Sequence, residues 1–299
     1  MKNRTMNGML QLLRPANLIT SSADIIAGFF IASAIIGKDS LIINDYKILI
    51  ILALSSMFLY GGGIVFNDYF DAERDALNKA NRPIPKGLVS RNQAFALGAF
   101  CFSMGIYLSF FVNQFSSILA VGICCTAFLY DAVGKQFDYF SPFLMGACRG
   151  LNLLLGMSAF PASLQYAELA MIPFLFIIGV TVIGQKEHLG RNRASIIVGS
   201  ILYLSSLVYF MYSLIQFEGN WWAALIFLGL WLAMLLPPTY KAWKTQRPLF
   251  VQKAVKYAVL SLILLNAGLV AAFGNSWFAL LLLPLLPITL GVAKVFRVT

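Results

Sequence analysis

The chain has 299 residues, of which 60% are hydrophobic and only 11% are charged. Soluble domains carry about 25% charged residues, so this composition excludes an ordinary soluble protein. The net charge of +10 does not indicate a nucleic-acid partner, because Lys and Arg accumulate in the cytoplasmic loops of membrane proteins.

Apolar runs long enough to cross a membrane recur along the whole chain. A hydrocarbon core about 30 Å thick needs about 20 apolar residues in a helix. The runs are apolar at odd and even positions alike, which excludes barrel strands. We therefore expect an all-α, polytopic membrane helical bundle of nine to ten transmembrane helices, in a single domain of residues 1–299. In chain order the runs lie near 16–36, 48–68, 94–112, 115–132, 141–160, 168–185, 195–216, 220–237, 254–273 and 276–293.

The basic residues of the loops predict the orientation of the bundle. The two tails and every second loop hold 18 Lys and Arg residues, whereas the opposite loops hold only Lys38 and Lys47. Such an asymmetry places both tails and the long polar loops in the cytoplasm. It favours an even number of spans, with nine as the alternative, and it puts the chemistry on the cytoplasmic side.

One stretch after the second apolar run gathers carboxylates on a helix face. At 100° per residue, Asp71 lies about 40° from Asn67, and Asp75 about 20° from Asp68. Like charges so placed destabilise a helix unless a cation lies between them. Mg²⁺ is the cation that such oxygen ligands favour, especially beside phosphate. The alternative is a solvated acidic helix end paired with Arg74.

Several motifs resemble those of the UbiA-type intramembrane prenyltransferases. The acidic stretch N-D-x-x-D-x-x-x-D (67–75) and the element N-R-P-I-P-K-G (81–87) are similar to the first aspartate-rich motif and the adjoining R-P-I-P-x-G of that family. R-P-x-N (14–17), together with Tyr130 and Lys135, is also similar. The resemblance implies helices around a lipid-open cavity and Mg²⁺-dependent transfer of a polyprenyl group from its diphosphate. Asp68, Asp71 and Asp75 are then the expected catalytic residues, and they bind metal together with Asn67.

Basic and aromatic residues near this stretch are candidates for substrate binding. Arg82, Lys86 and Lys135 are expected to contact the diphosphate, since charge-assisted hydrogen bonds to phosphate are strong. Their alternative role is that of ordinary cytoplasmic loop charges. Tyr130 is a candidate to stabilise an allylic cation through its ring.

The segment after the sixth apolar run departs from the family pattern. Residues 184–193 read G-Q-K-E-H-L-G-R-N-R, where the family carries a second aspartate pair, and only Glu187 is acidic. Glu187 with His188 is a candidate to hold a second metal, while Lys186 and Arg191 are candidates to bind phosphate directly. The alternative is a basic loop that no longer binds a second metal.

Two charges lie inside apolar runs, and such residues usually face the interior of a bundle. Asp24 lies about two turns into the first run, and Arg149 lies in the fifth. Arg149 is a candidate contact for a phosphate or an anionic acceptor. The alternative is a structural ion pair or a charged residue near a helix end that reaches to the membrane surface.

These observations predict an integral membrane prenyltransferase that uses Mg²⁺, a polyprenyl diphosphate and a small or lipid-soluble acceptor from the cytoplasm or bilayer. A narrower similarity, to the divergent EboC-like branch, comes from residues 149–152, 184–193 and 297–299. It supports the alternative function, a non-catalytic membrane protein that binds or moves an isoprenoid or a specialised-metabolite precursor.

Overall fold

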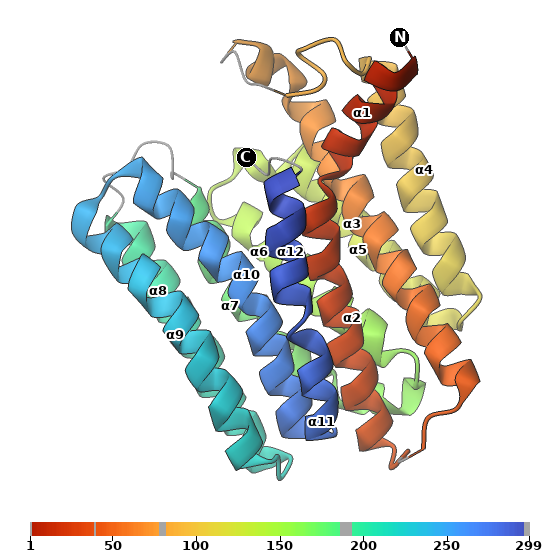
Figure 1. Ribbon diagram of the computed structural model, residues 1–299, viewed down its shortest axis with the longest axis vertical. Helices are drawn as coiled ribbons and strands as arrows, with labels where there is room; N and C mark the ends of the chain where they lie inside the picture. Colours follow the sequence, from red (N-terminus) through yellow and green to blue (C-terminus); the bar gives the residue numbers. More distant parts are fainter. Residues whose placement is uncertain (1, 39, 78–81, 186–192, 296–299) are drawn as a thin grey trace.

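The computed structural model describes residues 2–38, 40–77, 82–185 and 193–295. Every regular element in these ranges is a helix, as the apolar runs predict. In chain order (Figure 1) the elements are α1 (Lys2–Leu13), α2 (Pro15–Ile35), α3 (Ile43–Leu77), α4 (Arg91–Phe110), α5 (Gln114–Ala132), η1 (Gly134–Gln136), α6 (Phe140–Met157), η2 (Pro161–Ala170), α7 (Met171–Gly184), α8 (Arg193–Gln216), α9 (Trp221–Thr245), α10 (Pro248–Phe273), α11 (Ser276–Ala279), η3 (Leu280–Leu282) and α12 (Leu285–Val295).

Successive long helices run in opposite directions along one bundle. Helices α2–α5 lie on one side and α7–α10 on the other, with α12 in front of the junction (Figure 1). The 82–90 turn, the end of α9 and the start of α10 share one end of the bundle with Arg14 and Lys135, which we call the basic end. Lys38, just after α2, and Lys47, in the first turns of α3, lie at the opposite end.

Eight helices of the described ranges are long and apolar enough to cross a membrane. They are α2, α3, α4, α5, η2 with α7, α8, α9 and α10. Helix α6, which carries Arg149, is not among them. The last apolar run is not one helix but three short pieces, because Pro284 lacks the N–H that a continuous helix needs at that point. The predicted count of nine to ten is therefore confirmed only as far as eight.

Polar residues fix where several helices begin. Ser90 and Gln93 form a capping box at the start of α4. Asn113 caps α5 and Asn220 caps α9 through side-chain oxygens that accept backbone N–H groups. Such residues satisfy donors that have no partner within the helix, so the minimal loops at the end opposite the basic end are sufficient to reverse the chain.

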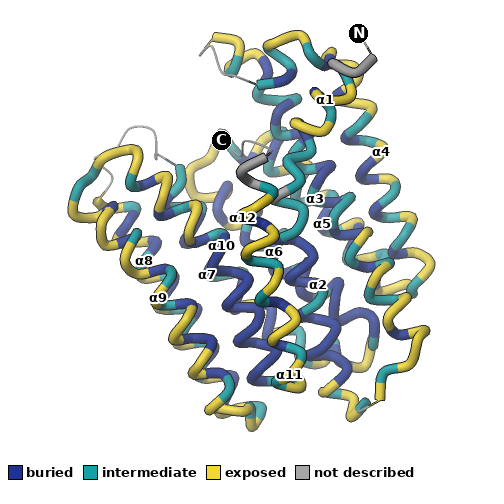
Figure 2. Tube along the Cα trace, viewed as in Figure 1, coloured by how far each residue is buried: buried dark blue, intermediate teal, exposed yellow. Residues whose placement is uncertain are grey.

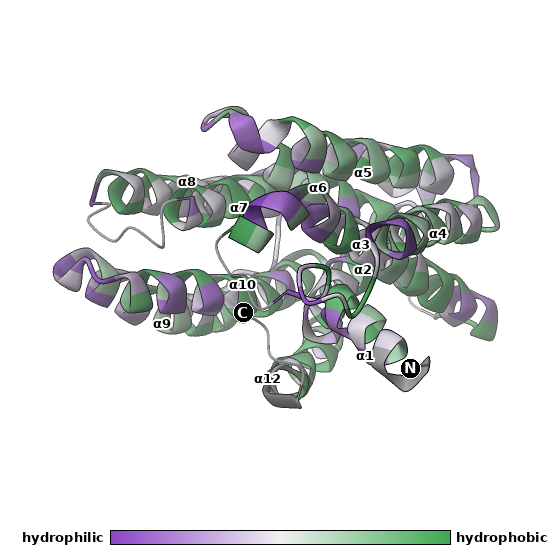
Figure 3. Ribbon diagram, turned by 90° about the horizontal axis from the view of Figure 1, so that it is seen from above, coloured by the Kyte–Doolittle hydropathy of each residue, from purple (hydrophilic) through white to green (hydrophobic). Residues whose placement is uncertain are grey.

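The core lies at the junction of the two sides. Figure 2 shows α2 and α10 as mostly buried, whereas α4, α8 and α9 carry many exposed residues. The exposed side chains of these outer helices include many large apolar ones, and Figure 3 shows the apolar character along α5 and α8. A protein that spans a bilayer needs an apolar outer surface, and its buried polar side chains hydrogen-bond between helices.

Helices α2 and α6 touch through their backbones. A Cβ atom at Gly28 would collide with the carbonyl oxygen of Leu153, and a Cβ atom at Gly156 would collide with that of Ile25. Small residues permit this close approach of helices, which is a common source of stability inside membranes. The two helices are thus in backbone contact in the half of the bundle away from the basic end.

This contact predicts that Gly156→Ala will lower the free energy of unfolding by about 1–3 kcal/mol, because overpacking forces the backbones apart. Gly229→Ala on α9 is the matched control, since a Cβ atom there meets nothing within 4 Å. Unfolding of both variants in mixed detergent micelles measures the difference. Equal stability of the two variants would contradict the close contact.

Candidate active site

Asp68 of α3 lies at the basic end and binds two arginines. Its Oδ1 atom is 2.6 Å from Nη2 of Arg14 and 2.7 Å from Nη1 of Arg82. Only 3% of the Asp68 side chain is exposed. Both arginines thus converge on one buried oxygen, although they lie 68 residues apart in sequence.

A lysine joins the second carboxylate of α3 to a carboxylate of α5. Nζ of Lys135 is 3.1 Å from Oδ2 of Asp71 and 3.0 Å from Oδ1 of Asp131. Asn67 donates a hydrogen bond of 3.1 Å to the same Asp131 oxygen. Arg74 pairs with the other oxygen of Asp71 at 3.1 Å. Alternating acidic and basic side chains therefore connect α3 to the end of α5.

We call the four carboxylates Asp68, Asp71, Asp75 and Asp131 the acidic cluster. Arg82 also reaches the last acid of the cluster on α3, with its Nε atom 3.9 Å from Oδ2 of Asp75. The four basic partners Arg14, Arg74, Arg82 and Lys135 match the four acids in number. The spacing of the acids predicts positive charge between them, and in this structure the basic side chains provide that charge. Among the described residues no three His, Cys, Asp or Glu side chains are arranged as a metal site.

Packing of α1 against the 82–90 turn positions both arginines. Leu12 of α1 and Val89 of the turn share a small buried cluster with Val65 and Ala94. Between α1 and α2, Arg14 takes a left-handed conformation with φ 45° and ψ 70°. The following Pro15 disfavours the right-handed helical region at Arg14, so the chain breaks there. The break directs the side chain of Arg14 to Asp68.

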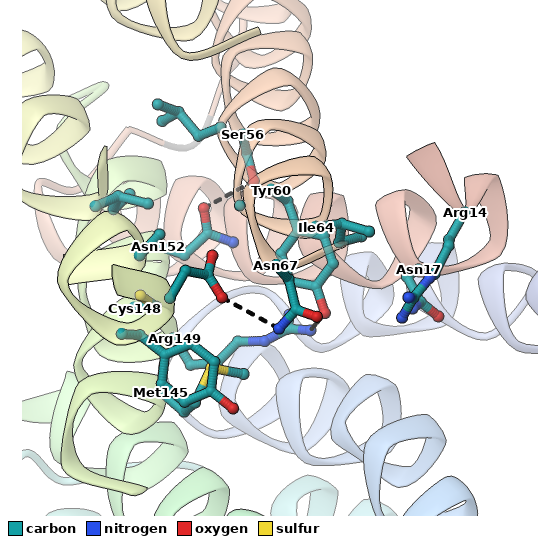
Figure 4. Close-up of a pocket in the computed structure, with 16 residues that line it drawn as sticks. Arg14, Asn17, Ser56, Tyr60, Ile64, Asn67, Met145, Cys148, Arg149 and Asn152 are labelled. Atoms are coloured by element: carbon teal, nitrogen blue, oxygen red, sulfur yellow. Dashed lines mark hydrogen bonds between the residues drawn. The ribbon is translucent and has the colours of Figure 1, made fainter. Parts of the chain in front are cut away.

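A cavity of about 190 Å³ opens beside the acidic cluster. Figure 4 shows its labelled residues, which come mainly from α3 and α6. Most of the lining residues come from α2, α3, α5 and α6, which are neighbours in the bundle. The lining residues are Arg14, Asn17, Ser56, Leu59, Tyr60, Gly63, Ile64, Asn67, Ile123, Ala127, Tyr130, Asp131, Met145, Cys148, Arg149 and Asn152. The cavity therefore combines a charged mouth with largely apolar walls.

The two intramembrane charges form an ion pair, which is the alternative that the sequence left open for Arg149. Nη1 of Arg149 is 2.8 Å from Oδ2 of Asp24, whose side chain is fully buried. Asn152 and Asn266 donate further hydrogen bonds to Asp24, at 2.9 and 2.7 Å. The guanidinium of Arg149 also lies over the ring of Tyr60, 5.0 Å from its centroid. The pair joins α2, α6 and α10, and Arg149 still reaches the cavity wall.

The structure brings together most of the residues that the sequence singles out. Asn67, the three α3 aspartates, Arg82 and Lys135 meet at the cavity mouth. Tyr130 lines the cavity, with its ring centroid 5.5 Å from Nζ of Lys135. Lys86 is exposed and makes no ion pair with a described residue, so it lies apart from the cluster. Lys186, Glu187 and Arg191 lie outside the described residues.

Sequence reasoning missed the role of Asp131 and the direct contact of Arg14 with Asp68. Asp131 is adjacent to Tyr130 and four residues before Lys135, a spacing that brings side chains together on a helix. That spacing was the available signal. No comparable signal in one sequence shows which carboxylate a distant arginine will contact.

The shared oxygen predicts non-additive effects of Arg14→Gln and Arg82→Gln on stability. Either arginine alone still pairs Asp68, but loss of both leaves a buried charge unpaired, which is strongly destabilising. We expect the double variant to lose about 0.5–3 kcal/mol more than the sum of the single losses. The control combines Arg14→Gln with Arg193→Gln on α8, whose guanidinium lies over the ring of Trp243. The effects of these two substitutions should add. Additive losses for the Arg14 and Arg82 pair would contradict the shared contact.

Comparison with known proteins places the chain in a family. The model of the UbiA prenyltransferase family matches residues 25–184. A digeranylgeranylglyceryl phosphate synthase of Methanocaldococcus jannaschii is 30% identical over 202 residues, which cover 67% of this chain and 69% of the relative. The synthase of Methanoregula boonei is 28% identical over 189 residues, covering 62% of this chain and 64% of the relative. The chain thus spans less than two thirds of that relative.

Solved structures share the fold. A UbiA homologue from Aeropyrum pernix matches with a TM-score of 0.70 and 16% identity, covering 85% of this chain and 96% of the other. A UbiA homologue from Archaeoglobus fulgidus, bound to DMAPP and Mg²⁺, matches with a TM-score of 0.58 and 13% identity, covering 96% and 99%. The family model covers more than half of the chain, and the protein accordingly belongs to the UbiA prenyltransferase family.

Proposed function

We propose that this protein transfers a polyprenyl group from a polyprenyl diphosphate to a small or lipid-soluble acceptor, in a Mg²⁺-dependent reaction. The observation that carries the proposal is the charge-balanced acidic cluster at the mouth of a largely apolar cavity. Membership of the UbiA prenyltransferase family supports it, as do relatives named as prenyl-transferring synthases. The charge distribution supports a multi-pass membrane protein whose site faces the cytoplasm.

Three basic groups are placed to bind a diphosphate. Arg14, Arg82 and Lys135 each hold a carboxylate now, at 2.6–3.1 Å, and each is partly exposed. A diphosphate entering the mouth offers them oxygens of higher charge, and arginine binds phosphate through two parallel hydrogen bonds. Lys86 is proposed as an outer contact, because it lies on the same turn as Arg82. Lys186 and Arg191 are proposed as contacts from the sixth loop.

The donor set of the cluster fits Mg²⁺. Carboxylate oxygens are the ligands that this ion prefers, and one or two of them suffice when substrate phosphates complete the coordination. Asp68, Asp71 and Asp75 with Asn67 are the proposed ligands, and Glu187 is proposed for a second ion. When bound, the ion supplies neutralising charge for the departing diphosphate.

The chain's own residues account for the rest of the transfer. The bond between the allylic carbon and the diphosphate oxygen breaks, and the diphosphate leaves with the electron pair. The acceptor forms the new bond to that carbon and loses a proton. Tyr130 and Tyr60 line the cavity, where their ring faces favour positive charge. The apolar walls exclude water, which protects a reactive allylic group from hydrolysis. Arg149 is proposed as a wall contact beside Tyr60.

The proposal predicts that Asp71→Asn lowers prenyl transfer at least about 100-fold, the usual scale for removing one group that stabilises developing charge. Glu73→Gln is the matched control, because Glu73 is an acid of the same helix that is 81% exposed and pairs with Arg91. The assay gives purified protein in bilayers radiolabelled geranylgeranyl diphosphate, membrane lipid extract and Mg²⁺, and follows labelled lipid and released diphosphate.

The same assay separates the two functions. Full activity of Asp71→Asn would show that the acidic cluster is not the reaction site. If the unaltered protein binds the diphosphate but forms no product and releases none, the non-catalytic carrier replaces the enzyme.

A further inference from the structure

Five exposed basic residues lie where α8 begins and where α9 ends and α10 begins, and we call them the unpaired basic surface. They are Arg193, Lys241, Lys244, Arg247 and Lys253. In the part of the chain that the structure describes, none of the five forms an ion pair. The basic residues around the acidic cluster, at the same end of the bundle, each hold a carboxylate. The basic end therefore has a charge-balanced part and a part with net positive charge.

The surrounding sequence offers no carboxylate to this surface. Residues 219–299 contain seven Lys and Arg residues and no Asp or Glu. Lys241 and Lys244 are three residues apart on α9, a spacing that brings their side chains together, and like charges so placed repel each other. The last third of the chain therefore cannot neutralise its own basic residues.

Three of these cations lie over aromatic rings. Nζ of Lys241 is 4.6 Å and Nζ of Lys253 is 5.8 Å from the ring centroid of Phe250. The guanidinium of Arg193 is 6.0 Å from the ring centroid of Trp243. A ring face attracts a cation but has no net charge of its own. The rings thus gather cations from α8, α9 and α10 and leave their positive charge available to an anion.

Helix dipoles account for only part of this charge. Basic residues stabilise the C-terminal end of a helix, which explains Lys244 in the last turn of α9. Arg247 is instead the N-cap residue of α10, whose first turn contains no acid. The N-terminal end of a helix has positive partial charge and favours anions. An anion at this position would stabilise both the helix end and the basic side chains.

Exposed apolar and aromatic side chains adjoin the cations. Tyr240, Trp243 and Leu249 are exposed, and the ring centroids of Tyr240 and Trp243 lie 6.0 Å apart. Helices α9 and α10 are both long and apolar enough to cross a membrane, and these residues lie near their ends. Trp and Tyr are common at the level where head groups meet acyl chains. The surface therefore suits a ligand that has an anionic head and an apolar tail.

We propose that the unpaired basic surface binds an anionic phospholipid. The head group accepts charge-assisted hydrogen bonds from the basic side chains, and the acyl chains lie against Trp243 and Leu249. Clusters of Lys and Arg beside a membrane-spanning helix attract anionic lipid. The turn between α9 and α10 lies on the far side of the basic end from the 82–90 turn (Figure 1), so this site is separate from the acidic cluster. The proposal does not depend on the proposed function.

Fluorescence quenching locates the lipid. Purified protein in bilayers is given phosphatidylglycerol with brominated acyl chains, because bromine quenches nearby Trp residues. Phosphatidylcholine with the same chains, which has a phosphate but no net charge, is the comparison. We expect stronger quenching by the anionic lipid, mainly at Trp243. Trp243→Phe, which keeps a ring for Arg193, should remove most of this excess, whereas Trp222→Phe at the other end of α9 should retain it.

Charge substitutions test which cations hold the head group. Lys241→Gln combined with Lys253→Gln should lower the affinity for phosphatidylglycerol relative to phosphatidylcholine at least about fivefold, because each cation near an anionic head group contributes to binding. The matched control combines Lys47→Gln with Arg91→Gln, which removes the same charge from two exposed positions elsewhere. The control should keep the unaltered ratio of affinities.

Four results would overturn the proposal. Equal quenching of the unaltered protein by the two lipids would show that the surface does not select anionic lipid. Retention of the excess in Trp243→Phe would place the lipid elsewhere. An equal loss of affinity in both double variants would show diffuse attraction by net charge. Recovery of fluorescence on adding inorganic phosphate at the concentration of the lipid would assign the site to free phosphate. If the Lys241 and Lys253 double variant fails to fold, the comparison of Trp243→Phe with Trp222→Phe decides alone.

Discussion

The structure depends on neutralising four carboxylates at one end of a membrane bundle. Unpaired, such charges would be costly there, and each would repel the next. Arg14, Arg74, Arg82 and Lys135 remove that cost, and to do so they bring distant segments together. The break after α1, the 82–90 turn and the end of α5 all lie where a basic side chain reaches α3. The charge balance thus organises the mouth of the cavity.

The same balance gives the site its proposed chemistry. Basic groups that stabilise the carboxylates now are those that a diphosphate would attract, and released carboxylates are suitable ligands for Mg²⁺. The ion pairs between carboxylates and basic side chains would therefore be replaced by pairs of carboxylates with Mg²⁺ and of basic side chains with diphosphate, at little net cost in free energy. Beside the charged mouth, the cavity has largely apolar walls, which also carry the hydrogen-bonded side chains of Ser56 and Asn152. This order matches a substrate with a charged head and an apolar tail.

Much of this arrangement follows from the sequence, because helical periodicity and apolar length are local properties. The acids of α3 share a face as their spacing predicts, and the apolar runs form helices. The contribution of Asp131 and the pairing of Arg14 with Asp68 depend on which helices become neighbours, and one sequence does not contain that information. The last apolar run is interrupted near Pro284, where a proline weakens a helix, and the apolar length on which the prediction rests does not show such a break.

The most direct test of the account is calorimetric titration of inorganic diphosphate into the purified protein, with and without Mg²⁺. The account predicts at least tenfold tighter binding with Mg²⁺, because the carboxylates need a cation once the basic side chains turn to phosphate. It also predicts that Asp71→Asn loses most of this Mg²⁺ dependence, while Glu73→Gln retains it. Equal affinity with and without Mg²⁺ in the unaltered protein would contradict the exchange of ion pairs on which the account depends.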